Sequence, residues 1–536
     1  MSKLAGGASS LCKTENGALQ AVSAGNACLD LYAKIGAMRN MPVGDQEKMF
    51  MKAAMENEDL ALRILLYAHD VREGAGERQV FKNLFPLACS LQSAEGSINL
   101  DLVWRLLNKI PELGRWDTLV ALMDKVPETI QILILDLIHK GLQSGNGLCA
   151  KWMPRQGKVA NRIRGYINKR MTTGELLTPK SYRKMLVSMS KTIEQLMSAG
   201  QWDAINYEHV PSVAMSRTKK AFSKHDGDRF GAYLTDVTSG EKKINASAVF
   251  PYDIIRDMSD PQATQAQWMA LPDYLKDTDG DSLVMADVSG SMEMHAVGGE
   301  VYPLHVSIGM AIYIAERNKG QFRNEILTFS EVPTFFQLDP SWTVCQKFEH
   351  IKATTDPFNT NVTLALMTIA QTCIDRKLSP EEMPKRLILI SDMQFDCVHV
   401  AGYGDHPWRT NHQAVKAAYA KLGLKLPDIV YWNVDARAEK GQPVTMHDSG
   451  VAMISGFSPA VMKSVFKTTL NPVAVMLDTV MVPRYDLNSA PVLPRPVLMK
   501  TAKKAERPLS FGAPANIGTP LNARGVAMAA FDQAKK

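Results

Sequence analysis

Two short apolar runs that each lead into an aspartate constrain this chain most strongly. Leu283–Ala286 is followed by Asp-Val-Ser-Gly-Ser at positions 287–291, and Arg386–Ile390 is followed by Ser391 and Asp392. Continuous apolar runs of this length are typical of strands buried inside a parallel sheet. Ligands of such sheets bind at the carboxyl ends of the strands. The pattern therefore predicts an α/β domain with a polar site at the ends of two strands.

Strands and helices alternate through the whole region from about 281 to 482. Strands are expected at 283–286, 325–329, 334–338, 386–390, 428–433 and 451–454, and helices at 304–317, 363–375, 411–422, 460–466 and 472–481. Alternation of this kind predicts a mostly parallel sheet that is covered on both faces.

Residues 1–280 show the periodicity of helices. Apolar residues recur at three- and four-residue spacings in 45–54, 60–69, 99–110 and 127–142, and strand-like alternation is scarce. Successive helices with short loops predict a solenoid of divergent, HEAT-like repeats or an irregular bundle. The polar stretch 260–281 is interpreted as the junction. We thus predict domains at 1–280 and 281–482 and a tail at 483–536 that is partly flexible.

The stretch from Lys151 to Arg229 is basic, with sixteen Lys and Arg against six Asp and Glu. Aromatic residues are interleaved at positions 152, 166, 182 and 202. Basic surfaces that carry aromatic rings are typical of nucleic-acid binding, although a solvated helical face with rings in the core is the simpler interpretation of any one residue. The predicted RNA-binding set is Lys151, Arg155, Lys158, Arg162, Arg164, Lys169, Arg170, Arg183, Lys184, Arg217, Lys219, Lys220 and Lys224.

A divalent cation fits the residues at the predicted strand ends. The candidate ligands are Asp287, Ser289, Ser291, Thr360 and Asp392. Carboxylate and hydroxyl oxygens suit Mg²⁺ better than a soft metal and leave one position open for a ligand oxygen. The alternatives are an Asx-turn or helix cap at 287–291 and a helix N-cap at Thr360.

Other classes of function find little support in the sequence. We see no Ser-His-Asp or Cys-His set and no P-loop, so neither an enzyme nor a nucleotide cofactor is expected. The seven cysteines are scattered without Cys-x-x-Cys pairs, which favours a reducing, cytoplasmic setting. No apolar run reaches the roughly 18 residues of a membrane span, and no signal peptide is evident.

The second half of the chain resembles a von Willebrand factor A domain with a metal-ion-dependent adhesion site, whose ligands match the five candidates above one by one. A helical half before such a domain resembles the Ro autoantigen, or TROVE-module, family. It is more similar still to an uncharacterised Ro-like family of plants, large DNA viruses and phages. The stretches that carry this resemblance are 14–17, 70–78, 110–117, 151–154, 198–202, 210–214, 219–226, 244–246, 287–292, 359–361, 390–395 and 451–458.

The resemblance implies a non-enzymatic RNA-binding scaffold. Helical repeats of Ro proteins close into a ring, bind small or misfolded RNA on a basic surface and admit single-stranded ends to the central hole. Here the segment 151–229 would face the RNA and the A domain would hold Mg²⁺. An alternative is a protein-interaction module whose metal captures an acidic side chain of a partner, with no role for RNA. A hydrolase that uses Asp287 and Asp392 is a more distant hypothesis.

Overall fold

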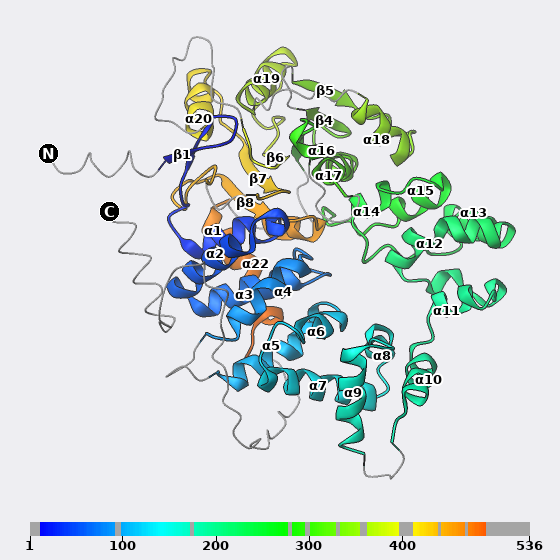
Figure 1. The fold of residues 1–536 in the computed structure, drawn as a ribbon. Helices are drawn as coiled ribbons and strands as arrows, with labels where there is room; N and C mark the ends of the chain where they lie inside the picture. The colour runs from blue at the N-terminus through cyan, green and yellow to red at the C-terminus, as the bar shows by residue number, and fades with distance from the viewer. Residues whose placement is uncertain are drawn as a thin grey trace. The chain divides into compact units, whose positions relative to one another are not determined.

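The computed structural model describes residues 11–91, 98–171, 176–276, 281–294, 301–328, 333–353, 362–395, 411–437, 441–466 and 470–488. The chain divides into two compact units. The first combines Met1–Leu84 with Lys191–Ser489, and the second contains Phe85–Ser190. Figure 1 labels the elements of both units along the chain.

A six-stranded sheet in the order β5-β4-β3-β6-β7-β8 lies in the first unit (Figure 1). The strands are β3 (Ser282–Ala286), β4 (Glu325–Thr328), β5 (Thr334–Gln337), β6 (Arg386–Ser391), β7 (Asp428–Asn433) and β8 (Val451–Ser455). Every neighbouring pair is parallel except β4 and β5. All residues of β3 and β8 are buried, as expected for strands covered on both faces. The predicted mostly parallel sheet is confirmed.

Helices connect these strands. They are α16 (Ser291–Met294), α17 (Pro303–Arg317), α18 (Val344–Lys352), α19 (Val362–Asp375), α20 (Asn411–Lys421), α21 (Met462–Val465) and α22 (Pro472–Val480), with short 3₁₀ turns η6 (Pro459–Val461) and η7 (Pro483–Tyr485). Helix α17 is apolar on nearly all sides and almost wholly buried. Helix α18 was not predicted, although Thr343 and Gln346 form a capping box at its start.

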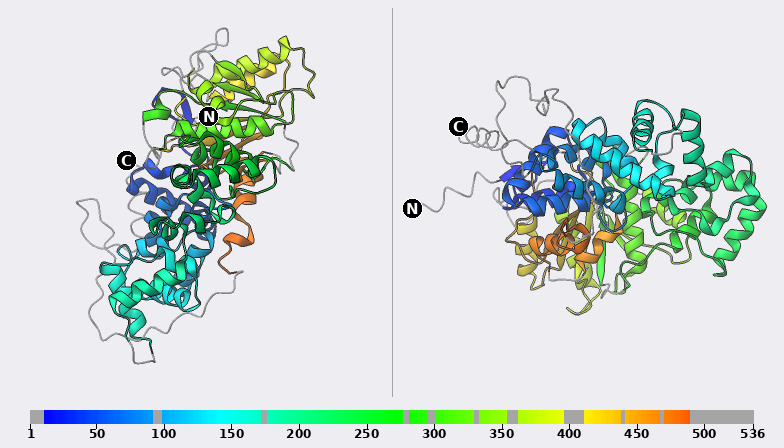
Figure 2. Two further views of the ribbon diagram at one scale, coloured as in Figure 1. Left: turned by 90° about the vertical axis from the view of Figure 1, so that its right-hand side faces the viewer. Right: turned by 90° about the horizontal axis from the view of Figure 1, so that it is seen from below.

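The N-terminal segment belongs to the same unit as the sheet. Its elements are the hairpin β1 (Leu11–Lys13) and β2 (Leu19–Ala21), α1 (Ala27–Ile35), η2 (Met38–Asn40), α2 (Val43–Glu56) and α3 (Glu58–His69). Helix α1 packs against β8 and α22, so the N-terminal helices lie beside the C-terminal elements in both views of Figure 2. A Cβ on Gly36 would lie 2.4 Å from the Ser455 carbonyl oxygen, so only glycine fits at this approach. The sequence did not reveal the hairpin or this packing.

The domains predicted at 1–280 and 281–482 divide the sequence, whereas the compact units group its parts in space. The first unit draws on both of these ranges, because α1 and α3 pack on elements of the C-terminal range. That division of the sequence stays a prediction. The tail beyond residue 488 lies outside the described residues, while Tyr485 just before it donates a hydrogen bond to the buried Asp70 over 3.1 Å.

The second unit is helical in its described part. Helix α4 (Arg78–Ala88) leads into it, followed by α5 (Leu100–Leu113), α6 (Asp117–Leu122), α7 (Glu128–Gln143), α8 (Gly147–Trp152), α9 (Lys158–Asn168) and α10 (Pro179–Ser190). Helix α7 packs on α5, α8 and α9, and α10 packs on α8. The helices expected at 99–110 and 127–142 are confirmed. The HEAT-like repeat and the closed ring stay predictions.

Further helices precede the sheet in the first unit. They are α11 (Ile193–Ser198), η4 (Trp202–Ala204), η5 (Tyr207–His209), α12 (Ser212–His225), α13 (Gly227–Thr238), α14 (Pro251–Ile255) and α15 (Pro261–Met269). Helix α15 lies inside the stretch 260–281, which was interpreted as a turn-rich junction; the place of the junction itself stays a prediction. The Asp260 carboxylate accepts a hydrogen bond from the Ala263 N–H over 2.9 Å, and Pro261 occupies the first helical position. The Asp-Pro pair that suggested a turn is instead a helix start.

Within the described ranges, we find no helix with the length and hydrophobicity to span a bilayer. The cysteines of these ranges are all free thiols.

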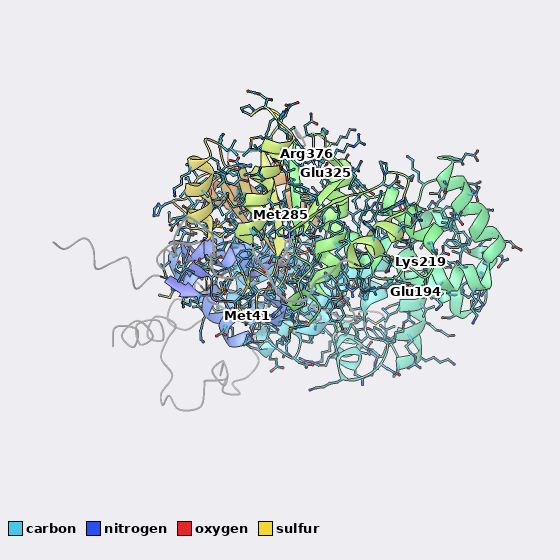
Figure 3. The ribbon with its side chains drawn as sticks, turned by 90° about the horizontal axis from the view of Figure 1, so that it is seen from above. Met41, Glu194, Lys219, Met285, Glu325 and Arg376 are labelled. Carbon is cyan, nitrogen blue, oxygen red and sulfur yellow. The ribbon has the colours of Figure 1, made fainter. Side chains whose placement is uncertain are left out.

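Glu325 of β4 and Arg376 form a bidentate ion pair over 3.0 Å at the side of the sheet. Both residues are labelled in Figure 3, together with Met285 of β3.

Candidate metal centre and basic surface

The two aspartates predicted as ligands lie at the point where the strand order of the sheet reverses. Strand β3 pairs with β6 on one side and with β4 on the other, so the chain leaves β3 in one direction and returns on the opposite side. Asp287 follows β3 and Asp392 follows β6, and both side chains are buried. In open α/β sheets this switch point is where ligands bind.

Serine hydroxyls surround the Asp287 carboxylate. Ser289 donates to Oδ1 through its hydroxyl over 2.6 Å and through its N–H over 3.0 Å. Ser391 donates its hydroxyl to Oδ2 over 2.6 Å. The hydroxyl oxygens of Ser289 and Ser291 are 3.2 Å apart. The structure thus brings Asp287, Ser289 and Ser291 together as predicted, and it adds Ser391, which the sequence analysis noted only as the end of a strand.

Burial of these carboxylates is electrostatically unfavourable without a cation. Burial raises the pKa of Asp287, and the neighbouring charge of Asp392 raises it further, to about 7. Burial also raises the pKa of Asp392, although the Arg437 guanidinium opposes that rise. Two buried carboxylates that disfavour each other's ionisation are the electrostatic setting that a divalent cation would relieve.

Arg437 is the main site residue that sequence reasoning missed. Its Nη2 donates to Asp392 Oδ2 over 2.9 Å and to the Ser291 carbonyl oxygen over 3.1 Å. Its Nε donates to Asp435 Oδ2 over 2.8 Å, and Asp435 Oδ1 accepts a hydrogen bond from Asn40 over 3.1 Å. Asp435 lies two residues beyond the end of β7, so the strand-end rule points to Asp435 but not to its partner Arg437.

The donor set fits a hard cation. It consists of carboxylate and hydroxyl oxygens. The Arg437 guanidinium pairs with Asp392 and Asp435, whereas Asp287 has only serine partners. Among the described residues no three or more His, Cys, Asp and Glu side chains converge as metal ligands. A cation here would therefore depend on the serine hydroxyls. Thr360, the fifth predicted ligand, lies outside the described residues.

The basic stretch is divided between the two units. Residues 151–190 carry ten Lys and Arg and a single acidic residue, and they belong to the second unit. Of these ten, Lys151, Arg162 and Arg164 are half-buried, and the others are exposed: Arg155, Lys158, Lys169, Arg170, Lys180, Arg183 and Lys184. In the first unit, Arg217, Lys220 and Lys224 are exposed on α12.

Helix α10 concentrates this charge on one face. Lys180, Arg183 and Lys184 follow the three- and four-residue spacing of a helix, whereas Tyr182 and Leu186 are buried on the opposite side. Together with Val187 and Ser188, the three cations line a shallow depression of about 330 Å³. In the part of the chain that the structure describes, no carboxylate pairs with any of the three. Lys180 was outside the predicted RNA-binding set.

The interleaved aromatic rings have other partners. Tyr166 and Tyr182 are buried, Arg115 stacks 3.7 Å above Trp152, and Trp202 stacks on His225 at 4.7 Å. Their positions match the simpler interpretation of core and packing residues. The structure therefore gives no support to base stacking on these rings, whereas the exposed cations suit phosphates.

Lys219 does not fit the predicted surface. It is fully buried on α12, where Figure 3 labels it, and its ammonium donates to Thr264 Oγ1 over 2.8 Å and to the Asp257 carbonyl oxygen. Burial lowers the pKa of Lys219, and the charges of Asp257 and Asp260 partly offset this. The prediction was wrong because the amphipathic spacing around Lys219 places it on the inner face of α12 rather than on the outer one.

Family comparisons divide the chain near the start of the sheet. Residues 168–282 match a model described as "Domain of unknown function (DUF2828)", and residues 281–480 match one described as "Domain of unknown function (DUF7788)". "Uncharacterized protein L728" of Acanthamoeba polyphaga mimivirus is 28% identical over 510 residues, which covers 87% of this chain and 86% of that protein. The chain is thus similar to a viral protein along most of its length.

Among solved structures, the chain is similar to the Ro (RSR) protein of Deinococcus radiodurans. The similarity covers 81% of this chain and 90% of that chain, at 12% sequence identity and a TM-score of 0.35.

Proposed function

We propose that this protein is a non-enzymatic RNA-binding scaffold that contacts phosphates through the basic helices of its second unit. The observation that carries the proposal is the ten-to-one ratio of basic to acidic residues across 151–190, most of them exposed. Lys and Arg that neutralise phosphates release condensed counterions, which favours binding of RNA irrespective of its sequence. Small or misfolded RNA is the expected ligand class.

The face of α10 supports this proposal more specifically than composition does. Lys180, Arg183 and Lys184 are exposed, without carboxylate partners in the described residues, and they border a depression rather than a ridge. Cations that are not already neutralised by the protein keep their full attraction for a polyanion. The described cysteines are free thiols, which favours a reducing compartment such as the cytoplasm for this activity.

A divalent cation such as Mg²⁺, held by Asp287, Ser289, Ser291 and Asp392, is the second part of the proposal. When bound, the ion would supply an open coordination position that attracts an acidic oxygen ligand. The surrounding residues position it: Ser391 holds the Asp287 carboxylate and Arg437 holds Asp392. Since the described shell consists of hydroxyls and paired carboxylates without a neighbouring general base, we propose adhesion rather than hydrolysis.

The buried Asp287–Asp392 pair also favours a second candidate function. In that case the protein is an interaction module that binds an acidic partner through the cation and has no role for RNA. Loss of a co-purifying partner from the Asp287→Ala variant, with no effect of RNase, would favour this alternative.

The proposal is tested by binding of a short fluorescent single-stranded RNA of mixed sequence to the intact protein, measured by anisotropy over a salt titration. We expect binding in the low micromolar range that weakens steeply between about 50 and 200 mM salt. Absence of binding at low salt, or binding that is indifferent to salt, would contradict the RNA proposal and leave the interaction module.

A further inference from the structure

Arg437 reaches the candidate metal centre from beyond β7, a strand that carries none of the proposed ligands. Its Nη2 donates to Asp392 Oδ2 over 2.9 Å and to the Ser291 carbonyl oxygen over 3.1 Å. Asp392 follows β6, whereas Ser291 is the first residue of α16, shortly after β3. A single nitrogen therefore bonds to one residue from each of the two strand ends that would hold the cation.

Both oxygens of the Asp392 carboxylate already accept hydrogen bonds. Oδ1 accepts from the Gln394 N–H over 3.1 Å, and Oδ2 accepts from Arg437. The Asp392 side chain is only 1% exposed, so the protein itself must satisfy the carboxylate. Oδ2 is the oxygen that is not bonded to the backbone of its own loop, which makes it the one available to a cation. A positive group of the protein holds it instead.

The Arg437 guanidinium and a bound divalent cation would repel each other. A guanidinium does not lose its proton in proteins, so Arg437 keeps its charge when a cation arrives. Two positive groups on one carboxylate oxygen are close neighbours, and burial leaves their repulsion poorly screened by water and salt. A cation therefore binds to Asp392 only at the expense of the bond from Arg437.

Asp435 gives the guanidinium a second partner outside the proposed ligand set. Arg437 Nε donates to Asp435 Oδ2 over 2.8 Å. Asp435 is itself held in place, because Asn40 donates to its Oδ1 over 3.1 Å and its N–H donates to Asn433 Oδ1 over 3.0 Å. The Arg437 side chain is 16% exposed, so part of it borders solvent. Arg437 can thus leave Asp392 and still keep a buried carboxylate as its partner.

We propose that Arg437 is a built-in competitor of the divalent cation at this site. This inference rests on the cation site proposed above. Without a cation, the guanidinium neutralises Asp392 and links it to Ser291. When a cation binds, Arg437 gives up both bonds and keeps Asp435. The site then has two alternative positive occupants, and its apparent cation affinity is reduced by the fraction of molecules in which Arg437 occupies it. An acidic ligand that needs the cation is bound only where the cation has displaced Arg437.

The first test compares Mn²⁺ binding by electron paramagnetic resonance in the intact wild type, Arg437→Gln and Arg437→Lys. We expect Arg437→Gln to bind Mn²⁺ roughly 10-fold more tightly than the wild type, a typical coupling between two competing groups. Arg437→Lys keeps the charge and should lie between the two. A purely structural role predicts the opposite sign, because an unsupported Asp392 would weaken the site. Arg376→Gln, which breaks the bidentate pair with Glu325, is the control and should match the wild type.

The second test uses the wild type alone, so it also decides the case if Arg437→Gln does not fold. Phenylglyoxal modifies guanidinium groups, and the modified peptides are identified by mass spectrometry. We expect Arg437 to react several-fold faster with Mg²⁺ than with a chelator, and Arg376 to react equally in both.

Two results would overturn the inference and leave the cation site standing. One is equal or weaker Mn²⁺ binding by a folded Arg437→Gln protein. The other is a reactivity of Arg437 that is indifferent to Mg²⁺ in a wild type that binds Mn²⁺. A wild type that binds no Mn²⁺ would overturn the cation site and this inference together.

Discussion

The candidate metal centre and the basic helical surface place charge in opposite ways. Asp287 and Asp392 are buried, lie far apart in sequence and meet only because β3 and β6 pair. Lys180, Arg183 and Lys184 are exposed and lie on successive turns of one helix. A buried charge requires ion-pair or hydrogen-bond partners that the fold holds in place. An exposed charge is solvated by water, and its effect on a ligand adds to that of the neighbouring charges. We therefore expect a single substitution at the metal centre to have a large effect on cation affinity. On the basic surface, we expect the effects of several substitutions on RNA affinity to add up.

The largest effect is expected for Asp287→Ala. Loss of one of two carboxylates, with the serine hydroxyls that it orients, should weaken Mn²⁺ binding by more than about 100-fold, since even outer-shell changes cost 10–100-fold. Isothermal titration calorimetry measures this, with the exposed Asp124→Ala as a control. RNA binding should be unchanged. A parallel loss of RNA affinity in a folded Asp287→Ala protein would break the separation between the two regions.

Charge reversal on α10 should have the next largest effect. The triple change of Lys180, Arg183 and Lys184 to Glu removes about three phosphate contacts. In a plot of the logarithm of the RNA association constant against the logarithm of the salt concentration, the slope should become less steep by about 2. We expect an affinity loss of roughly 10- to 100-fold at low salt, measured by anisotropy. Reversal of Lys416, Lys421 and Lys425 on the α/β part provides a control of equal charge. An equal loss in both variants would show that only net charge matters.

Lys219 sharpens the comparison because it is basic in sequence but buried in the fold. Lys219→Met leaves the Asp257 carbonyl oxygen and the Thr264 hydroxyl without their buried donor, so the free energy of unfolding should fall by about 1–3 kcal/mol in urea denaturation. The neighbouring exposed Lys220→Met should change it by less than about 0.5 kcal/mol. A selective loss of RNA affinity in Lys219→Met, without destabilisation, would contradict the buried position.

The smallest effect is expected at the periphery of the metal centre. Asn40→Ala removes the hydrogen bond to Asp435, which is one step away from Asp392 through Arg437. Stability should fall by about 0.5–1.5 kcal/mol by thermal unfolding. Mn²⁺ affinity should change less than in Asp287→Ala. A change as large as that of Asp287→Ala would mean that Arg437 and Asp435 belong to the metal site itself.

Local rules recovered much of the fold. Continuous apolar runs located the strands of the sheet, and the strand-end rule placed Asp287 beside Asp392 without any structural information. These predictions succeeded because periodicity and strand polarity are properties of short segments. The helix at Pro261–Met269 was missed although its start is also a local feature, because an Asp-Pro pair begins both turns and helices.

Long-range packing could not be predicted in this way. Nothing in the segment 11–40 indicates that its hairpin bonds to Phe395 or that Gly36 meets β8. Lys219 has the same chemistry as Lys220, and only the packing of α12 against α15 distinguishes them. Arg437 follows a strand end but is recruited by Asp392 from another strand. These features depend on which segments meet, which a single sequence does not reveal.

Crosslinking tests the central claim most directly. The intact protein would be irradiated with a short photoreactive RNA, with Mg²⁺ or with a chelator, and the crosslinked peptides identified by mass spectrometry. We predict that crosslinks concentrate in 151–190, with the same distribution in both conditions. Crosslinks that concentrate in 281–294 and 386–395 and disappear with the chelator would contradict the account, because they would place RNA at the metal centre instead of on the basic helices.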